Sequence, residues 1–303
     1  MENIKNFEEF TTAVVEGVKE FLPERFGNAE ISLQTVIKNN NMRLTGLIIR
    51  AVEDSVTPNI YLENFFEKYK VNQNFEEILK EIVDMRMKHD CPSEFDTSMI
   101  MDFEKAKSQI FPRLVNRDRN ENLLNERPHT DIENLTVTYA VMVSKTVDGI
   151  ASAPITYQMM NVWGITVDEL HSVAVENLPT INPSKFGGMS EVIMEMMGES
   201  DPLMESMFSG DEMMYVLSNI TGINGATALL DEQMMNEIYE SLGAIYILPS
   251  SIHECIIVRT ENMNLEELKF MVCEVNCSQV PDEDILSNSV YTWNPEEGLQ
   301  LVD

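Results

Sequence analysis

Basic side chains are what this sequence most lacks. No lysine or arginine occurs between Lys185 and Arg259, and only Lys269 follows. Over residues 186–303, two bases stand against 22 Asp and Glu, and the whole chain carries a formal net charge of −30 from 51 acids and 21 bases. Such a surface repels nucleic acid and anionic membranes and attracts basic molecules. We therefore expect a basic protein partner and no direct binding to nucleic acid or membrane.

A membrane-spanning segment and a disulfide framework are also missing. No apolar run approaches the roughly 20 residues that span a bilayer. The first residues, MENIKNFEEF, are polar and acidic, whereas a signal peptide begins basic and then turns apolar. Cys91, Cys255, Cys273 and Cys277 show no framework spacing, which fits a reducing compartment. These features predict a cytoplasmic protein and say nothing of its oligomeric state.

The stretch 212–259 alternates most clearly between strand-like and helix-like patterns. Met213–Leu217 and Ala226–Leu230 are apolar runs separated by TGING, which predicts a hairpin. Asp231 then stands at an N-cap position before apolar residues at helical spacing, and Gly243 follows as a stop signal.

Two further strand-like runs, 244–248 and 255–258, follow that helix. The order strand, strand, helix, strand, strand is typical of an α+β fold with mixed or antiparallel sheets. Similar patterns earlier in the chain predict two α+β lobes, residues 1–130 and an acidic lobe 131–303. Pro112 and Pro128 frame the stretch at this boundary.

Two motifs carry a resemblance to a known family. INGA..LL (residues 223–230) and ILPSSIHE (residues 247–254) resemble an uncharacterised family of gut clostridia and their mobile elements. KNNNMRLTGLIIR (residues 38–50) and the stretch 111–129 fit the same family. The resemblance implies no activity, so it assigns no catalytic residue and no cofactor.

One locally basic stretch, residues 111–129, contains Arg113, Arg117 and Arg119. The planar fork of arginine binds carboxylate or phosphate through two parallel hydrogen bonds, which makes these residues candidates for an anion clamp. The alternative is a solvated connector whose arginines pair with the surrounding acids.

Ser251, His253 and Glu254 are the candidates for catalysis by a hydrolase. A serine nucleophile needs a base within hydrogen-bond reach, and residues 251 and 253 of an extended strand point to the same side. The G-x-S-x-G elbow is absent. The alternative is a tight turn whose hydroxyls bind the backbone and whose histidine is satisfied nearby.

Metal ligands have weaker patterns. Cys273 and Cys277 share one helix face and can ligate zinc if His253 and Cys255 join them, but no C-x-x-C spacing occurs. The alternative is two buried structural cysteines. The acidic clusters 210–212 and 282–284 can hold magnesium in a metal-assisted enzyme, although neighbouring acids are usually only solvated. We expect no cofactor, because TGINGA lacks the phosphate-loop lysine and glycine spacing.

The leading hypothesis is a non-enzymatic, acidic interaction module, and its most specific form is a nucleic-acid mimic that inhibits a basic host or defence protein. The alternative is a hydrolase or metal-assisted enzyme that uses the residues above. A segment rich in Met and acids supplies the candidate partner-binding residues, because flexible Met side chains suit adaptable surfaces. These candidates are Glu191, Glu195, Glu199, Asp201, Glu205, Asp211 and Glu212.

Overall fold

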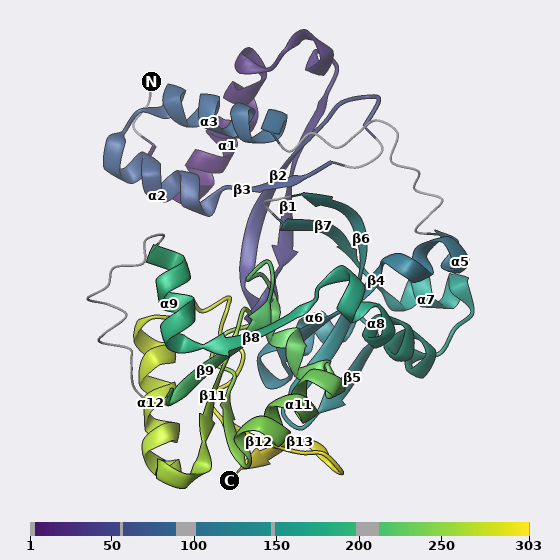
Figure 1. Ribbon diagram of the computed structural model, residues 1–303. Coiled ribbons are helices and arrows are strands. Elements are labelled where there is room, and N and C mark those ends of the chain that lie inside the picture. The colour runs from purple at the N-terminus through teal and green to yellow at the C-terminus, as the bar shows by residue number, and fades with distance from the viewer. Residues whose placement is uncertain (1–3, 55–56, 89–100, 147–148, 198–211, 303) are drawn as a thin grey trace. The chain divides into compact units, whose positions relative to one another are not determined.

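The chain has an α+β fold, as its pattern predicts (Figure 1). The structure, a computed structural model, describes residues 4–54, 57–88, 101–146, 149–197 and 212–302. Contacts divide the chain into two compact units, the first made of residues 1–38 and 42–98, and the second made of residues 39–41 and 99–303.

The first unit packs helices on one antiparallel sheet. The sheet has the order β1-β2-β3, formed by Glu30–Ile37, Arg43–Arg50 and Asn59–Tyr61. Its helices are α1 (Phe7–Gly17), α2 (Glu63–Asn72) and α3 (Phe75–Lys88), with 3-10 turns η1 (Val18–Phe21) and η2 (Glu24–Phe26). The apolar spacing of α1 and α3 buries Phe10, Val14, Ile78 and Ile82 in one core.

The second unit contains two antiparallel sheets. One has the order β4-β6-β5, with β7 also paired to β6, and the other has the order β13-β12-β10-β11-β9-β8. The strands are β4 (Ile110–Asn116), β5 (His129–Ile132), β6 (Leu135–Thr146), β7 (Gly149–Pro154), β8 (Ser184–Gly188), β9 (Met214–Asn219), β10 (Ile245–Leu248), β11 (Cys255–Arg259), β12 (Val290–Asn294) and β13 (Gly298–Val302).

Several helices of this unit begin at side-chain caps. The Thr166 hydroxyl and the Glu169 carboxylate form a capping box at α8, and Asp231 accepts a hydrogen bond from the Met234 N–H at α11. The helices are α5 (Phe103–Ala106), α6 (Glu121–Leu124), α7 (Tyr157–Trp163), α8 (Val167–Ile181), α9 (Met189–Met197), α11 (Glu232–Leu242) and α12 (Leu265–Ser278). Shorter 3-10 turns are η3 (Asn39–Asn41), η4 (Lys107–Gln109), η5 (Asp118–Asn120), η6 (Gly225–Leu230) and η7 (Thr260–Asn262).

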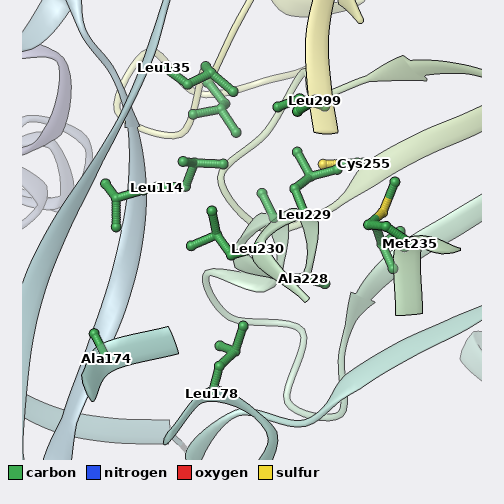
Figure 2. Close-up of a cluster of buried hydrophobic side chains, with 14 of the residues drawn as sticks. Leu114, Leu135, Ala174, Leu178, Ala228, Leu229, Leu230, Met235, Cys255 and Leu299 are labelled. Atoms are coloured by element: carbon green, nitrogen blue, oxygen red, sulfur yellow. The ribbon is translucent and has the colours of Figure 1, made fainter. Parts of the chain in front are cut away.

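The main core of the second unit is built from both of its sheets, α8, α11 and η6. Leu114 and Leu135 come from one sheet, Cys255 and Leu299 from the other, and Leu229 lies among them (Figure 2). The second sheet uses its other face as well. There, a separate cluster places Leu268 and Val272 of α12 against strand residues.

The run 226–230 is a correction to the sequence prediction. It forms the 3-10 helix η6 and not the second strand of a hairpin. Asn224 adopts a left-handed conformation with φ of 52°, which starts the turn, and all six residues of η6 are buried. Since every side of the turn faces the core, its apolar sequence has neither a strand period nor a helix period. Within its sheet, β9 pairs with β11 on one side and with β8 on the other.

The stretch 111–129 is more than a connector. Residues 111–116 of this stretch belong to the strand β4, and every residue of β4 pairs with a residue of β6. The boundary drawn near residue 130 from the sequence therefore falls inside β5 and inside the second unit, whereas the contacts divide the chain between residues 98 and 99. The strand is buried on both faces, so its apolar residues do not alternate with polar ones and give no period-2 signal.

Candidate functional site

The Ser251–Glu254 segment joins β10 to β11. The Ser251 hydroxyl oxygen accepts a hydrogen bond from the His253 backbone N–H at 3.0 Å, which makes a local turn. Glu254 is exposed, whereas the next residue, Cys255, is buried. The Ser251 hydroxyl thus forms a hydrogen bond with the backbone, as expected for the tight-turn alternative.

Both ring nitrogens of His253 have other partners. The Asn224 N–H donates to Nδ1 at 3.2 Å, and Nε2 lies 3.2 Å from Asp284 Oδ1. An accepting Nδ1 leaves the proton on Nε2, which donates it to the carboxylate. The imidazole has no free lone pair with which to take a proton from Ser251, so this geometry contains no activated serine.

The two motifs INGA..LL and ILPSSIHE meet at this point. The Ala226 N–H donates to the Ile252 carbonyl at 3.1 Å, and the Ser218 hydroxyl donates to the His253 carbonyl at 2.7 Å. Between them sits Gly225, where an added Cβ would lie 2.3 Å from the His253 carbonyl oxygen and 2.1 Å from the Ser218 Oγ. The glycine is required because backbone approaches backbone here.

The cysteines do not gather into a metal site. Cys255 is buried in the main core, and burial raises the pKa of its thiol. Cys273 and Cys277 are exposed on α12, so neither is one of two buried structural cysteines. In the part of the chain that the structure describes, no group of three or more Cys, His, Asp or Glu side chains is placed to hold a metal ion.

The acidic clusters also stay apart. Asp282 and Glu283 are exposed, while Asp284 is occupied by His253. Glu212, the one described residue of the 210–212 cluster, accepts a hydrogen bond from the Ser190 hydroxyl.

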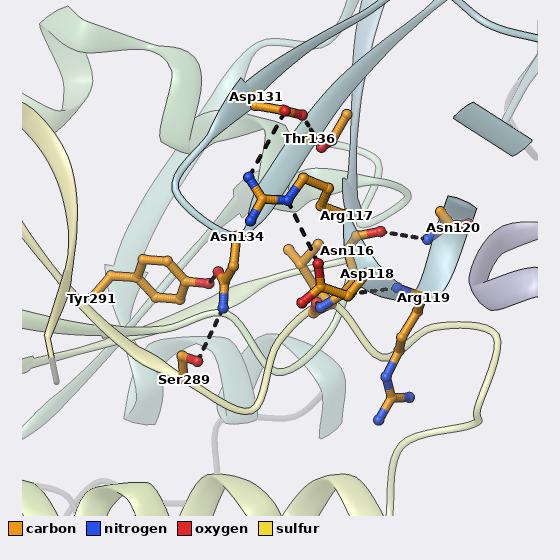
Figure 3. A network of polar contacts seen from close by, with 11 residues as sticks. Asn116, Arg117, Asp118, Arg119, Asn120, Asp131, Asn134, Thr136, Ser289 and Tyr291 are labelled. Atoms are coloured by element: carbon orange, nitrogen blue, oxygen red, sulfur yellow. Dashed lines mark hydrogen bonds and ion pairs between the residues drawn. The ribbon is translucent and has the colours of Figure 1, made fainter. Parts of the chain in front are cut away.

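The three arginines of the predicted clamp have different surroundings. Arg117 lies 3.6 Å from Asp118 Oδ1 and 3.8 Å from Asp131 Oδ2, so nearby acids balance its charge (Figure 3). Arg119 is exposed on η5. Arg113 is different, because its guanidinium donates to the Ser152 hydroxyl at 2.7 Å and makes no ion pair with an acid among the described residues.

The candidate partner-binding acids are only partly described. Glu191 and Glu195 are exposed on α9, and Glu195 pairs with Lys185 at 2.5 Å. Glu199, Asp201, Glu205 and Asp211 lie outside the described residues.

A cavity of about 240 Å³ lies in the second unit and was not predicted from the sequence. Leu114, Leu230 and Trp293 contribute apolar walls, and His171 lines it as well. The His171 Nδ1 lies 3.0 Å from the Tyr139 hydroxyl, and burial lowers the pKa of His171. Burial also raises the pKa of Tyr139 to about 12. A periodic sequence pattern cannot reveal such a site, because its wall comes from seven separate elements: β4, β5, α8, η6, α11, β12 and β13.

Comparison of the sequence with protein families matches residues 7–294 to a family of unknown function, DUF5688. The chain belongs to DUF5688. Comparison with curated proteins and with solved structures gives no match. In the described part of this DUF5688 chain, no helix is long and apolar enough to cross a membrane.

The exposed face of α12 carries a large aromatic side chain among acids. Phe270 is 71% exposed, and Met271 and Val275 are exposed beside it. Glu267 and Glu274 lie three and four residues from Phe270, so they share its face of the helix. The opposite face holds α12 to the sheet, which leaves this apolar and acidic face open to solvent.

Proposed function

We propose that the chain is a non-enzymatic protein-binding module, and that its second unit binds a basic protein through the exposed face of α12. The single observation that carries the proposal is the exposure of Phe270 in the middle of an acidic helix face. Its most specific form is a module that occupies the nucleic-acid-binding surface of its partner.

Apolar area supplies the affinity in this proposal. Burying a phenylalanine side chain is worth about 1.5–3 kcal/mol, and central aromatic residues surrounded by polar ones dominate protein interfaces. A scattered apolar side chain on a surface is ordinary, and Met271 and Val275, one helical turn apart, are each only a little over a third exposed. Phe270 shares its face of α12 with Glu267 and Glu274, so the apolar area that a partner covers there is chiefly the phenyl ring of Phe270.

Charge supplies the choice of partner. Lys269 pairs with Glu266 at 3.6 Å, whereas Glu267 and Glu274 make no ion pair with any described residue. Complementary charge speeds association and excludes acidic partners, and it weakens as salt screens it. The partner is therefore expected to present Lys or Arg around an apolar pocket.

The test is capture of partners from a lysate of the native host on the tagged protein, at low and at moderate salt, with identification by mass spectrometry. We expect a basic nucleic-acid-binding protein that is recovered at low salt and lost as salt rises. The double variant Phe270→Ser with Glu274→Lys should lose this protein. Both residues are exposed, so the variant should fold as the wild type does.

A matched control makes the same kind of change elsewhere on the second unit. Ile220→Ser with Glu237→Lys replaces one exposed apolar residue and one exposed acid. This control should keep the partner. Recovery of no basic protein, or equal recovery by the wild type and the α12 variant, would refute the proposal.

A further inference from the structure

The cavity in the second unit has apolar walls that come from both of its sheets. Leu114 lies on β4 of one sheet, and Trp293 and Leu299 lie on β12 and β13 of the other. Leu229 and Leu230 of η6 complete the wall, and Figure 2 shows them in the same core as Leu114 and Leu299. All five side chains are buried, so the packing of the main core holds the walls in place.

Two carboxylates stand where the cavity meets solvent. Glu232 is the first residue of α11, Glu297 lies in the turn between β12 and β13, and both line the cavity and are exposed. Glu297 accepts a hydrogen bond from the Gln300 amide at 2.8 Å, and neither acid forms an ion pair with a described residue. No Lys or Arg is among the described residues that line the cavity. An apolar interior thus ends in an acidic rim.

His171 of α8 adds a polar group to the lining. Its Nδ1 lies 3.0 Å from the Tyr139 hydroxyl, which in turn lies 2.5 Å from the Thr130 hydroxyl. Burial lowers the pKa of His171 more than the charge of Asp168 raises it, so the imidazole is neutral at pH 7 and does not repel a cation. With its proton on Nδ1, the ring presents Nε2 as an acceptor.

The volume of the cavity limits the size of a ligand. It measures about 240 Å³, whereas an apolar cavity of about 150 Å³ is large enough to bind benzene. Pockets for drug-sized molecules begin near 300 Å³. The cavity therefore fits a molecule of one ring or one short branched chain that carries a single polar group.

We propose that this cavity is a binding site for a small primary amine, held as its ammonium cation, with an apolar body the size of one aromatic ring. The apolar body packs against Leu114, Leu230 and Trp293, and the ammonium group donates hydrogen bonds to Glu232 and Glu297 at the rim. An indole ring also attracts a cation that lies within about 6 Å of it.

Charge decides between an amine and other ligands of the same size. A carboxylate ligand would meet two like charges at the rim and no base in the lining, whereas the net charge of −30 attracts cations at long range. None of the residues that line the cavity belongs to α12, so the site is separate from the proposed protein-binding face.

The test is a titration of the full chain with benzylamine, benzyl alcohol and benzoate, at pH 7 and constant ionic strength. These probes share one ring and are positive, neutral and negative. The indole N–H signals in a proton–nitrogen NMR spectrum report binding, and Trp163→Phe assigns them. The Trp293 indole N–H donates to Asn236 Oδ1 at 2.9 Å, which fixes this reporter at the wall of the cavity.

We expect benzylamine to shift the Trp293 signal in a saturable way and to leave the Trp163 signal unchanged. Benzyl alcohol should bind about tenfold more weakly, because it lacks the charge-assisted hydrogen bonds, and benzoate should not bind. No shift of the Trp293 signal with benzylamine, or benzoate binding as tightly as benzylamine, would overturn the proposal.

A pair of double variants tests the rim. Glu232→Gln with Glu297→Gln removes both carboxylates at nearly constant size and should weaken benzylamine binding about tenfold. Glu237→Gln with Glu296→Gln is the matched control, because it changes one acid on α11 and one in the same turn, neither of which lines the cavity. All four acids are exposed, so both variants should fold. Equal affinity of the two variants for benzylamine would overturn the proposal.

A further variant distinguishes the cavity from the acidic surface around it, which also attracts amines. Val175 of α8 lines the cavity and is half-buried, so Val175→Phe places a ring in the space that the ligand occupies. This variant should lose the response of the Trp293 signal to benzylamine, while an unchanged Trp163 signal shows that it is folded. Wild-type affinity in Val175→Phe would assign the amine to the surface and contradict the proposal.

Discussion

Gly225 offers the sharpest test of how the INGA and ILPSSIHE motifs work. The structure places its Cα against backbone, and a Cβ there would meet the His253 carbonyl oxygen at 2.3 Å and the Asn219 nitrogen at 2.8 Å. Backbone atoms cannot rotate away as the end of a side chain can. Gly225→Ala must therefore separate η6 from the segment that ends at His253.

The cost can be worked out from what this separation breaks. Overpacking a core typically costs about 1–3 kcal/mol. The shift also weakens the hydrogen bonds Ala226 N–H to Ile252 O and Asn224 N–H to His253 Nδ1, at about 1 kcal/mol each. The sum of about 3–5 kcal/mol is a large part of the 5–15 kcal/mol by which domains are stable.

Gly187→Ala is the matched control for this change. Gly187 lies on β8 of the same unit, and an added Cβ there would meet only the carboxylate of Glu191, at 3.0 Å. That carboxylate ends an exposed side chain and can swing away, while alanine in a strand is favoured over glycine by about 0.5–1 kcal/mol.

Urea unfolding followed by tryptophan fluorescence measures the difference. Both tryptophans, Trp163 and Trp293, belong to the second unit, so the signal reports the unit that contains Gly225. We expect Gly225→Ala to unfold at much lower urea than Gly187→Ala. Free energies of unfolding that agree within about 1 kcal/mol between the two variants would refute the steric argument.

Three further predictions follow from single side chains. Because burial lowers the pKa of His171, the unfolded chain binds this proton at a higher pH than the folded chain does. The free energy of unfolding should therefore fall as the pH drops through about 6.5. In His171→Gln, the free energy of unfolding measured with urea should change less between about pH 7.5 and pH 5.5. Asp54→Ala removes the carboxylate that pairs with the buried Arg86 and should lower the free energy of unfolding by about 3–5 kcal/mol, measured by circular dichroism. An unchanged free energy of unfolding would contradict this prediction. In a Cys91→Ser background, a thiol reagent should modify the two α12 cysteines in the native protein and Cys255 only after unfolding; fast modification of all three would contradict it.

Much of the fold is predictable from the sequence because local signals agree with tertiary packing. The helix at Glu232–Leu242 has Asp231 at its cap, apolar spacing along its length and Gly243 with φ of 77° at its end. The strands at 245–248 and 255–259 are likewise apolar runs that pair with each other in the sheet. The run 226–230 is misassigned because it is buried on every side, and short apolar runs of this kind carry no period.

The candidate sites are harder to predict, because each depends on which strands are neighbours. Arg113 is brought next to Ser152 by the pairing of β4 with β6 and of β6 with β7. His253 was identified from the sequence, but its partners Asn224 and Asp284 are each about 30 residues away, and their contacts make it structural. Only the packing of α12 shows that Phe270 faces solvent.

The most direct test of the proposed function is photocrosslinking from position 270 in living cells of the native host. A photoreactive phenylalanine analogue replaces Phe270 in one variant and Ile220, another exposed residue of the second unit, in a second. The proposal predicts a light-dependent adduct with one basic protein from position 270 and none from position 220. No adduct from position 270, or the same adducts from both positions, would contradict it.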